Sequence, residues 1–333
     1  MKTLSILSAL VLFSAAAKAQ TFTDVKLVPQ LSEALAVSED GSTILGNSVG
    51  PNAAPGIYTV ASTAFAPFNA SGGAAYFLSG GVSGDGLVAV GAQGLQTFAW
   101  TPAMVYDMTP VFGFDCNDVS TSGLVLAGSY SLGGVLRSRW IELTTGTVVE
   151  LGALTPTGGS KTEGLSGNGR YVVGATTDPA NGFADLPFRF DVLTQSYQLL
   201  SPMGSGNGTA RDVSANGSVV VGTMNGEAFA WTASGGLQLL GFLQGSVASH
   251  AHGVSKDGRW VVGQCEFGGG VSRAFVLDLQ SPGSSMKDMT QLLAAGLPSG
   301  TVLTAAYDVD LDGNVVVGLA LAANGAAIGF HTL

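Results

Sequence analysis

The chain alternates short apolar runs with glycine-containing turns, and one ten-residue pattern of this kind occurs seven times. In the copy Val254–Gly263, an apolar element ends at Val254-Ser255, Asp257-Gly258 reverses the chain, and a second apolar run stops at Gly263. Asp-Gly or Asn-Gly between two such runs is a strong hairpin signal, because glycine adopts positive φ without a steric penalty. The second run is apolar on successive residues, which indicates a strand covered on both faces.

The copies share the form V-S-x-D-G-x-x-V-V-G, with Asn or Ser sometimes replacing the Asp. Their turn glycines are 37 to 55 residues apart. This period is typical of one propeller blade or one solenoid turn. The copies are Val37–Gly46, Val82–Gly91, Val119–Gly128, Leu165–Gly174, Val213–Gly222, Val254–Gly263 and Val309–Gly318.

A second pattern follows each copy and usually ends in an aromatic residue, as in TFAW at 97–100 and AFAW at 228–231. A short turn and a further strand complete the unit, which predicts four short strands, A to D in chain order. Four antiparallel strands per unit are typical of a propeller blade. Because Trp100, Trp140 and Trp231 share one repeat position, we expect them in the core between blades rather than on a sugar-binding surface.

The order of the strands predicts how the ring closes. The seventh unit ends at Leu333 just after strand C, whereas Phe22–Leu31 precedes the first strand A and resembles Met286–Leu292, the predicted strand D of the sixth unit. We therefore expect Phe22–Leu31 to complete the seventh blade and to cover sheet edges that would otherwise promote aggregation. The predicted fold is all-β, a single seven-bladed β-propeller over residues 20–333 with its last blade closed by the N-terminal strand. The alternative, a linear β-solenoid, would not need this split unit.

The units are similar to those of the HAF-repeat, or extracellular-repeat, family, which read V-S-x-D-G-x-V-V-G, then A-F-x-W, then L-G. The best matches are Val213–Gly241 and Ser249–Gly263. The resemblance covers 22–333 and implies a propeller-like exported bacterial protein. It implies no catalytic residues, and the first unit departs most from the pattern.

The N-terminus predicts the protein's location, and the positions of the cysteines predict whether they form a disulfide. Residues 1–19 have the pattern of a secretory signal peptide, with Lys2 before an apolar segment and an A-x-A cleavage site at 17–19. We expect cleavage before Gln20 and export to the periplasm or the cell exterior. Cys116 and Cys265 lie at unrelated positions in the third and sixth units, so two separate buried thiols are expected rather than a disulfide.

Net charge and hydropathy exclude several classes of partner. The formal net charge of −10 disfavours nucleic acid and anionic membranes. No apolar run beyond the first 20 residues approaches the roughly 18 residues of a membrane span, so membrane insertion is not expected. The sequence contains no nucleotide-binding loop, no nucleophile elbow and no paired-cysteine zinc pattern.

Any binding site is expected on the face formed by the D-to-A and B-to-C connections, because these vary in length and variable loops on a rigid scaffold usually carry binding. Strand A lines the channel, and the residue two before the repeat Val or Leu is diverse and often polar. In four consecutive units this residue is Glu163, Arg211, His252 and Tyr307. We expect these candidate ligand-binding residues to converge at the channel mouth. Mutual salt bridges at a hydrated entrance are the alternative.

His250 joins this candidate site because it lies two residues before His252 on one strand, so both side chains should face the same side. With a neighbouring carboxylate the pair could hold Zn²⁺. It could equally supply acid–base chemistry, because histidine titrates near neutrality.

The segment Asp308–Gly313 resembles the start of a Ca²⁺ loop, with Asp308, Asp310 and Asp312 at alternate positions before a turn glycine. The same place in the other units is a plain hairpin. No cofactor is therefore expected. If the protein does bind a metal ion, Ca²⁺ at this segment or Zn²⁺ at the histidines is the ion expected.

These observations predict an exported, non-catalytic binding or surface-interaction protein, a monomer whose variable-loop face contacts a glycan or a protein partner. The alternative is a hydrolase or lyase acting on an extracellular polysaccharide. Glu163, Arg211, His252 and Tyr307 would then be its acid–base and charge-neutralising groups, within reach of one shared cleft. A third reading is a structural module of an envelope assembly, with the mouth closed by internal salt bridges.

Overall fold

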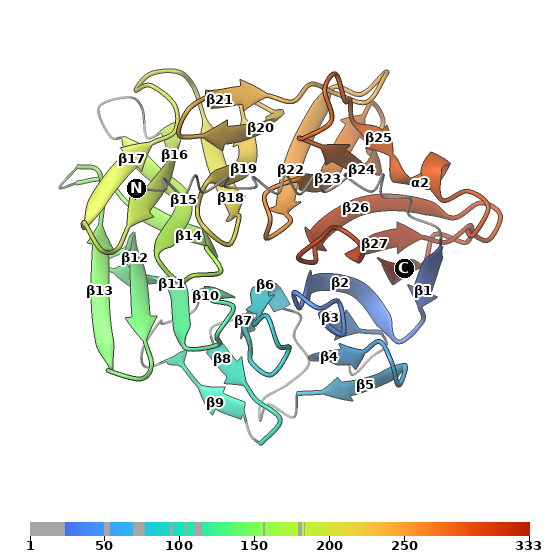
Figure 1. Cartoon of the computed structure of the whole chain (residues 1–333), viewed down its shortest axis with the longest axis horizontal. Helices are drawn as coiled ribbons and strands as arrows, with labels where there is room; N and C mark the ends of the chain where they lie inside the picture. The colour runs from blue at the N-terminus through green and yellow to red at the C-terminus, as the bar shows by residue number, and fades with distance from the viewer. Residues whose placement is uncertain are drawn as a thin grey trace, which may run out of the picture.

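The computed structural model describes residues 24–49, 54–68, 77–93, 96–103, 105–109, 115–155, 157–178, 182 and 184–333. These residues form seven four-stranded antiparallel sheets, arranged as blades around a central axis (Figure 1). The predicted all-β fold and the seven-bladed propeller are confirmed. The predicted signal peptide, residues 1–19, lies outside the described residues.

The first four blades are continuous in sequence, and strand A of each lies nearest the axis. Blades 1 and 2 are β2 (Leu31–Val37), β3 (Thr43–Ser48), β4 (Pro55–Thr59), β5 (Ala64–Pro67), and β6 (Phe77–Val82), β7 (Ala89–Gln93), β8 (Gln96–Trp100), β9 (Val105–Asp107). Blades 3 and 4 are β10 (Asp115–Val119), β11 (Val125–Leu132), β12 (Val135–Glu142), β13 (Thr147–Gly152), and β14 (Ser160–Leu165), β15 (Tyr171–Asp178), β16 (Ala184–Asp191), β17 (Ser196–Leu199).

Blades 5 and 6 have the same order, and blade 7 takes its outermost strand from the N-terminus. Blade 5 is β18 (Gly208–Val213), β19 (Val219–Met224), β20 (Glu227–Thr232) and β21 (Gly236–Leu239). Blade 6 is β22 (Ala248–Val254), β23 (Trp260–Phe267), β24 (Val271–Asp278) and β25 (Lys287–Asp288). Blade 7 is β26 (Val302–Val309), β27 (Val316–Leu321), β28 (Ala327–Thr332) and β1 (Val25–Val28).

The ring closes as the sequence predicts. β1 pairs antiparallel with β28, from Val25 opposite Thr332 to Val28 opposite Gly329. Figure 1 shows β1 beside the C-terminus. Val25 is buried in the same apolar cluster as Phe330, so the closure is held by side-chain packing as well as by backbone hydrogen bonds.

The repeated V-S-x-D-G pattern forms a hydrogen-bonded turn between strands A and B. In blade 2, Ser83 Oγ donates to Asp85 Oδ1 at 2.7 Å and accepts from Val88 N–H at 2.9 Å. Asp85 Oδ1 also accepts from Leu87 N–H at 3.0 Å. Gly86 has φ +70°, the left-handed conformation that this turn requires. The Ser and the Asp are therefore selected by the turn itself.

Strand A carries a β-bulge just before this pattern in every blade except the second. In blade 5, Ala210 is opposite Gly222 and Asp212 is opposite Val221, so Arg211 is the extra residue. A bulge re-aims side chains, and here the successive residues Arg211 and Asp212 both line the channel. The closing glycine allows the close approach, because a Cβ on Gly222 would lie 2.0 Å from the carbonyl oxygen of Thr209.

One predicted strand is wrong in its second half. The segment expected to be strand D of blade 6 pairs only through β25, and the chain then turns into helix α2 (Met289–Leu292). Asp288 causes the change, because its Oδ1 accepts the N–H groups of Thr290 and Gln291 and so caps the helix.

The remaining packing predictions agree with the structure. Cys116 and Cys265 are both buried, and neither forms a disulfide. Trp231 is 4% exposed, and the indole N–H of Trp140 donates to the Gly169 carbonyl of the next blade at 2.7 Å.

In the described part of the chain, no helix has the length and apolar character required to cross a membrane.

The turn glycines give a matched stability test. Gly217 (φ +76°) and Gly226 (φ +81°) both have left-handed backbones. A Cβ on Gly217 would lie 2.0 Å from the Tyr171 ring of the neighbouring blade, whereas a Cβ on Gly226 would meet nothing within 4 Å. We expect Gly226→Ala to lower the free energy of unfolding by about 1 kcal/mol from backbone strain. Gly217→Ala should lower it by about 2–4 kcal/mol, because overpacking is added. Urea denaturation measures both, and equal losses would contradict inter-blade packing at this turn.

Candidate functional site

A small polar cavity, the central well, lies on the axis between the seven A strands. Its volume is about 100 Å³. Its walls combine several carboxylates with two cations, a histidine and a tyrosine, arranged at three levels. The upper level, the mouth ring, consists of the residue two before the repeat Val or Leu in each blade: Leu35, Gly80, Asn117, Glu163, Arg211, His252 and Tyr307.

The structure brings four of the five predicted site residues together in this ring. Glu163 forms an ion pair with Lys161 at 2.9 Å. The His252 and Tyr307 rings lie 5.6 Å apart between centroids. Among the described residues, the guanidinium of Arg211 has no hydrogen bond and no ion pair, and its Nε is enclosed. Mutual salt bridges between Glu163 and Arg211 therefore do not close the mouth.

Burial sets the protonation states of the mouth ring. Burial, with the nearby charge of Arg211, lowers the pKa of His252 to about 3. The imidazole is therefore neutral at neutral pH, and its enclosed Nε2 has no partner among the described residues. Burial also raises the pKa of Tyr307 to about 12. Neither group titrates near pH 7.

His250, the fifth predicted residue, lies outside the well. Its Nδ1 is 3.2 Å from Thr223 Oγ1, and its Nε2 is 3.3 Å from a carboxylate oxygen of Glu266. His252 instead lines the well beside Tyr307, so the two histidines do not form the pair that the sequence predicts.

The middle level is a ring of three carboxylates from alternate blades. We call Asp118, Asp212 and Asp308 the carboxylate ring. One oxygen of each accepts the next N–H in its own strand, at 2.7–2.8 Å. The other accepts an N–H of the following blade, at 2.8, 2.8 and 3.0 Å respectively. The three aspartates thus connect blades 3 to 4, 5 to 6 and 7 to 1.

Lys256 is the cation associated with this ring. No described carboxylate forms a direct ion pair with its ammonium, so it acts across the cavity. Burial lowers the pKa of Lys256, but Asp212, Asp118 and Asp308 more than offset this and raise it above its usual value. Burial raises the pKa of Asp118 to about 6 and that of Asp308 to about 7, although Lys256 opposes both shifts.

The lower level, the floor ring, constricts the channel at the A-to-B turns through backbone hydrogen bonds between blades. The Gly84 N–H donates to Thr121 O at 3.0 Å, and the Leu311 N–H donates to Glu39 O at 3.1 Å. Thr121 Oγ1 also donates to the Glu39 carboxylate, which joins blades 3 and 1 directly. The floor ring consists of the x residues of the repeat: Glu39, Gly84, Thr121, Gly167, Ala215, Lys256 and Leu311.

The three alternating aspartates do not share a site. Asp308 belongs to the carboxylate ring, Asp310 is 4% exposed within the hairpin, and Asp312 is exposed. Within the described ranges, no group of three or more His, Cys, Asp or Glu side chains is placed to hold a metal ion.

Two grooves on the variable-loop face adjoin the well. The blade 3–4 groove, of about 530 Å³, includes Glu163, Leu136 and Asp185. The blade 6–7 groove, of about 470 Å³, includes Tyr307, Val271 and Leu321. Because Glu163 and Tyr307 also line the well, its mouth opens towards both grooves.

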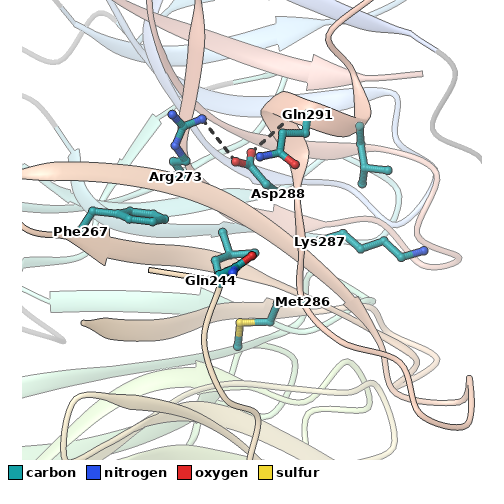
Figure 2. Close-up of a pocket in the computed structure, with 9 residues that line it drawn as sticks. Gln244, Phe267, Arg273, Met286, Lys287, Asp288 and Gln291 are labelled. Atoms are coloured by element: carbon teal, nitrogen blue, oxygen red, sulfur yellow. Dashed lines mark hydrogen bonds and ion pairs between the residues drawn. The ribbon is translucent and has the colours of Figure 1, made fainter. Parts of the chain in front are cut away.

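A third hollow, the outer pocket, lies on the rim of blade 6 and has a volume of about 650 Å³ (Figure 2). Arg273 lies 3.3 Å from Asp288, the residue that caps α2, and 6.0 Å from the centre of the Phe267 ring. Figure 2 shows Met286 and Lys287 on the opposite wall. This pocket combines apolar side chains with charged ones.

Sequence reasoning missed Asp118, Asp212 and Lys256 as residues of the well. A regular strand would direct the aspartates away from the channel, and only the bulge directs them inward. The available signal was the tripeptide Asp-Val-Ser or Asp-Val-Asp in units 3, 5 and 7, where other units have Gly or Ala. Lys256 is the one basic residue at the x position of the repeat.

Comparisons with known proteins identify the fold. No protein-family model and no curated protein matches the chain. The β-propeller domain of Cps50 (Swd1) from Myceliophteria thermophila is similar in structure, with 12% identity, a TM-score of 0.59, and coverage of 91% of this chain and 97% of that one. The Dos1 propeller has 10% identity, a TM-score of 0.54, and coverage of 94% and 95%. A putative TolB from Agrobacterium tumefaciens has 14% identity, a TM-score of 0.51, and coverage of 78% and 91%. At these identities the likeness shows a propeller fold alone.

Lys256→Met tests the electrostatics of the well. Asp118 and Asp308 have folded-state pKa values above the unfolded value of about 3.9, so their contribution to stability is present at low pH and is lost as the pH rises through about 6 to 7. At pH 7.5 both are ionised and depend on Lys256, and its removal should cost about 3–5 kcal/mol. At pH 5 both are protonated, so the cost should be clearly smaller.

Urea denaturation of the variant at pH 5 and pH 7.5 measures this difference. Lys287→Met, which removes an exposed lysine of the outer pocket, is the control and should have little effect at either pH. A loss for Lys256→Met that is the same at both pH values would show that Lys256 does not compensate the carboxylates.

Proposed function

We propose that this protein is exported and acts as a non-catalytic binding protein, whose variable-loop face contacts a protein or peptide partner. The observation that carries the proposal is the position of the hollows. Among the described residues, the two grooves, the mouth of the well and the outer pocket all lie at D-to-A or B-to-C connections. The signal-peptide pattern of residues 1–19 supports export. The resemblance to HAF repeats also supports export, and membership of that family stays a prediction.

The size of the well, and the pKa values of the two mouth-ring groups expected to act as acid and base, favour binding over polysaccharide cleavage. Its volume of about 100 Å³ is well below the roughly 300–1,000 Å³ of ordinary small-molecule sites. His252 and Tyr307, the proposed acid–base groups, have pKa values near 3 and 12. General acid–base catalysis near neutral pH works best with pKa values near the working pH.

The groove walls favour a polypeptide partner. Val271 and Leu321 of the blade 6–7 groove are 48% and 38% exposed, and Leu292 of the outer pocket is 45% exposed. Exposed aliphatic side chains at concave sites with polar rims are typical of protein interfaces. The net charge of −10 favours a basic partner.

The test uses peptides selected from a random display library on the immobilised mature protein. Leu321→Arg places a charge in the blade 6–7 groove, and Leu124→Arg places the same charge on the opposite, A-to-B turn face, where Leu124 is 46% exposed. We expect Leu321→Arg to weaken binding of the selected peptides at least tenfold, because a buried interface position is disrupted. Leu124→Arg should change it less than twofold.

Binding that survives Leu321→Arg but is lost in Leu124→Arg would place the partner on the A-to-B turn face and contradict the proposal. Failure to select any peptide, together with new reducing ends or unsaturated products after incubation with polysaccharides, would support the enzyme instead.

A further inference from the structure

The central well holds more negative than positive charge at its middle level. Asp118, Asp212 and Asp308 surround one ammonium, that of Lys256, without a direct ion pair. Each carboxylate accepts two backbone N–H bonds, and an ionised carboxylate has about four acceptor sites. Acceptor capacity therefore remains for a second cation that enters from the mouth.

The structure favours an organic cation over a metal ion. In the described part of the chain the carboxylates are not placed to coordinate one ion together. A primary ammonium has three N–H donors and can reach three separated carboxylates through hydrogen bonds. The volume of about 100 Å³ admits an ammonium on a slender chain.

The mouth ring specifies what must accompany the ammonium. Arg211 directly precedes Asp212 on the bulge, and its guanidinium has no partner among the described residues. The neighbouring His252 is neutral, with an enclosed and unpartnered Nε2. A lysine side chain would place only methylene groups beside Arg211 and leave it unpaired. A chain N-terminus places a carbonyl oxygen next to its ammonium, and that oxygen accepts hydrogen bonds.

We infer that the central well binds the N-terminus of a partner polypeptide, with the α-ammonium at the carboxylate ring and the first carbonyl oxygen at Arg211. This rests on the proposed function, because it takes the partner to be a polypeptide. The first residue is small, given the size of the well. The following residues leave past Glu163 or Tyr307 into the blade 3–4 or the blade 6–7 groove.

Binding depends on pH through the groups that face the ligand. Asp118, Asp212, Asp308 and Glu39 attract the ammonium, whereas Lys256 and Arg211 oppose it. Affinity rises as Asp118 and Asp308 ionise, between about pH 6 and 7. It falls again as the free α-amino group loses its proton near pH 8.

The experiment compares three probes by ligand-observed NMR titration of the mature protein at constant ionic strength. The first is triglycine amide with a free N-terminus, the second is its N-acetylated form, and the third is Nα-acetyl-lysine amide. We expect acetylation to weaken binding at least tenfold and the lysine probe to bind at least fivefold more weakly than triglycine amide. Affinity for triglycine amide should pass through a maximum between pH 7 and 8.

Two variants locate the interaction. Arg211→Met should weaken triglycine amide binding at least fivefold and leave thermal unfolding nearly unchanged, because the guanidinium has no described partner. Arg139→Met is the matched control, since Arg139 pairs with Glu150 at the outer edge of blade 3, away from the well. It should leave binding unchanged.

The outcomes separate this inference from the proposed function. Equal binding of the free and acetylated tripeptides, or no binding of either, overturns the inference, and the library-selected peptides still test the variable-loop face. Equal binding of the lysine probe together with no effect of Arg211→Met overturns the N-terminal assignment in favour of a lysine side chain. If the library also yields no peptide, both proposals fail.

Discussion

The approach of strands A and B at the bulge is the contact on which the ring depends. A Cβ on Gly222, Gly263 or Gly318 would lie 2.0 to 2.1 Å from a carbonyl oxygen of the facing strand A. No side chain fits there, so the last glycine of the repeat is fixed by the backbone itself. This close approach accommodates the extra residue of the bulge, and the bulge turns two successive side chains towards the axis.

The bulge has an electrostatic consequence at the axis. The residue that follows the bulged one is a glycine in blades 4 and 6, Gly164 and Gly253, and it leaves room for the backbone of the next blade. Where it is an aspartate, the carboxylate reaches the backbone of that next blade. Such hydrogen bonds to a charged group strengthen the inter-blade contact, but they also concentrate negative charge in a buried space. Lys256 offsets part of that charge.

The two faces of the ring differ in how strongly their connections are restricted. The A-to-B turns are built by the Ser–Asp hydrogen bonds and are tied together by the floor ring, so their sequence is restricted. The connections of the opposite face differ in length and polarity. The mouth of the well and the grooves lie there, on a scaffold held rigid by the other face. Under the proposed function, this face offers a partner one surface with a charged centre and aliphatic sides.

The sequence by itself determined the number of blades, the turn chemistry, the closure through residues 25–28, and the mouth ring. These follow from local rules: glycine permits the turn, alternation sets the strand, and equal positions in equal repeats occupy equal places. Only the tertiary structure decided which side chains face the axis below the mouth, because a one-residue bulge reverses the alternation after it. It also decided that Asp288 caps a helix instead of extending a strand, and that His250 pairs with Glu266 outside the well. It placed Lys256 where its charge acts across the cavity on three aspartates from other blades. Such contacts join residues tens of positions apart, and no local pattern specifies them.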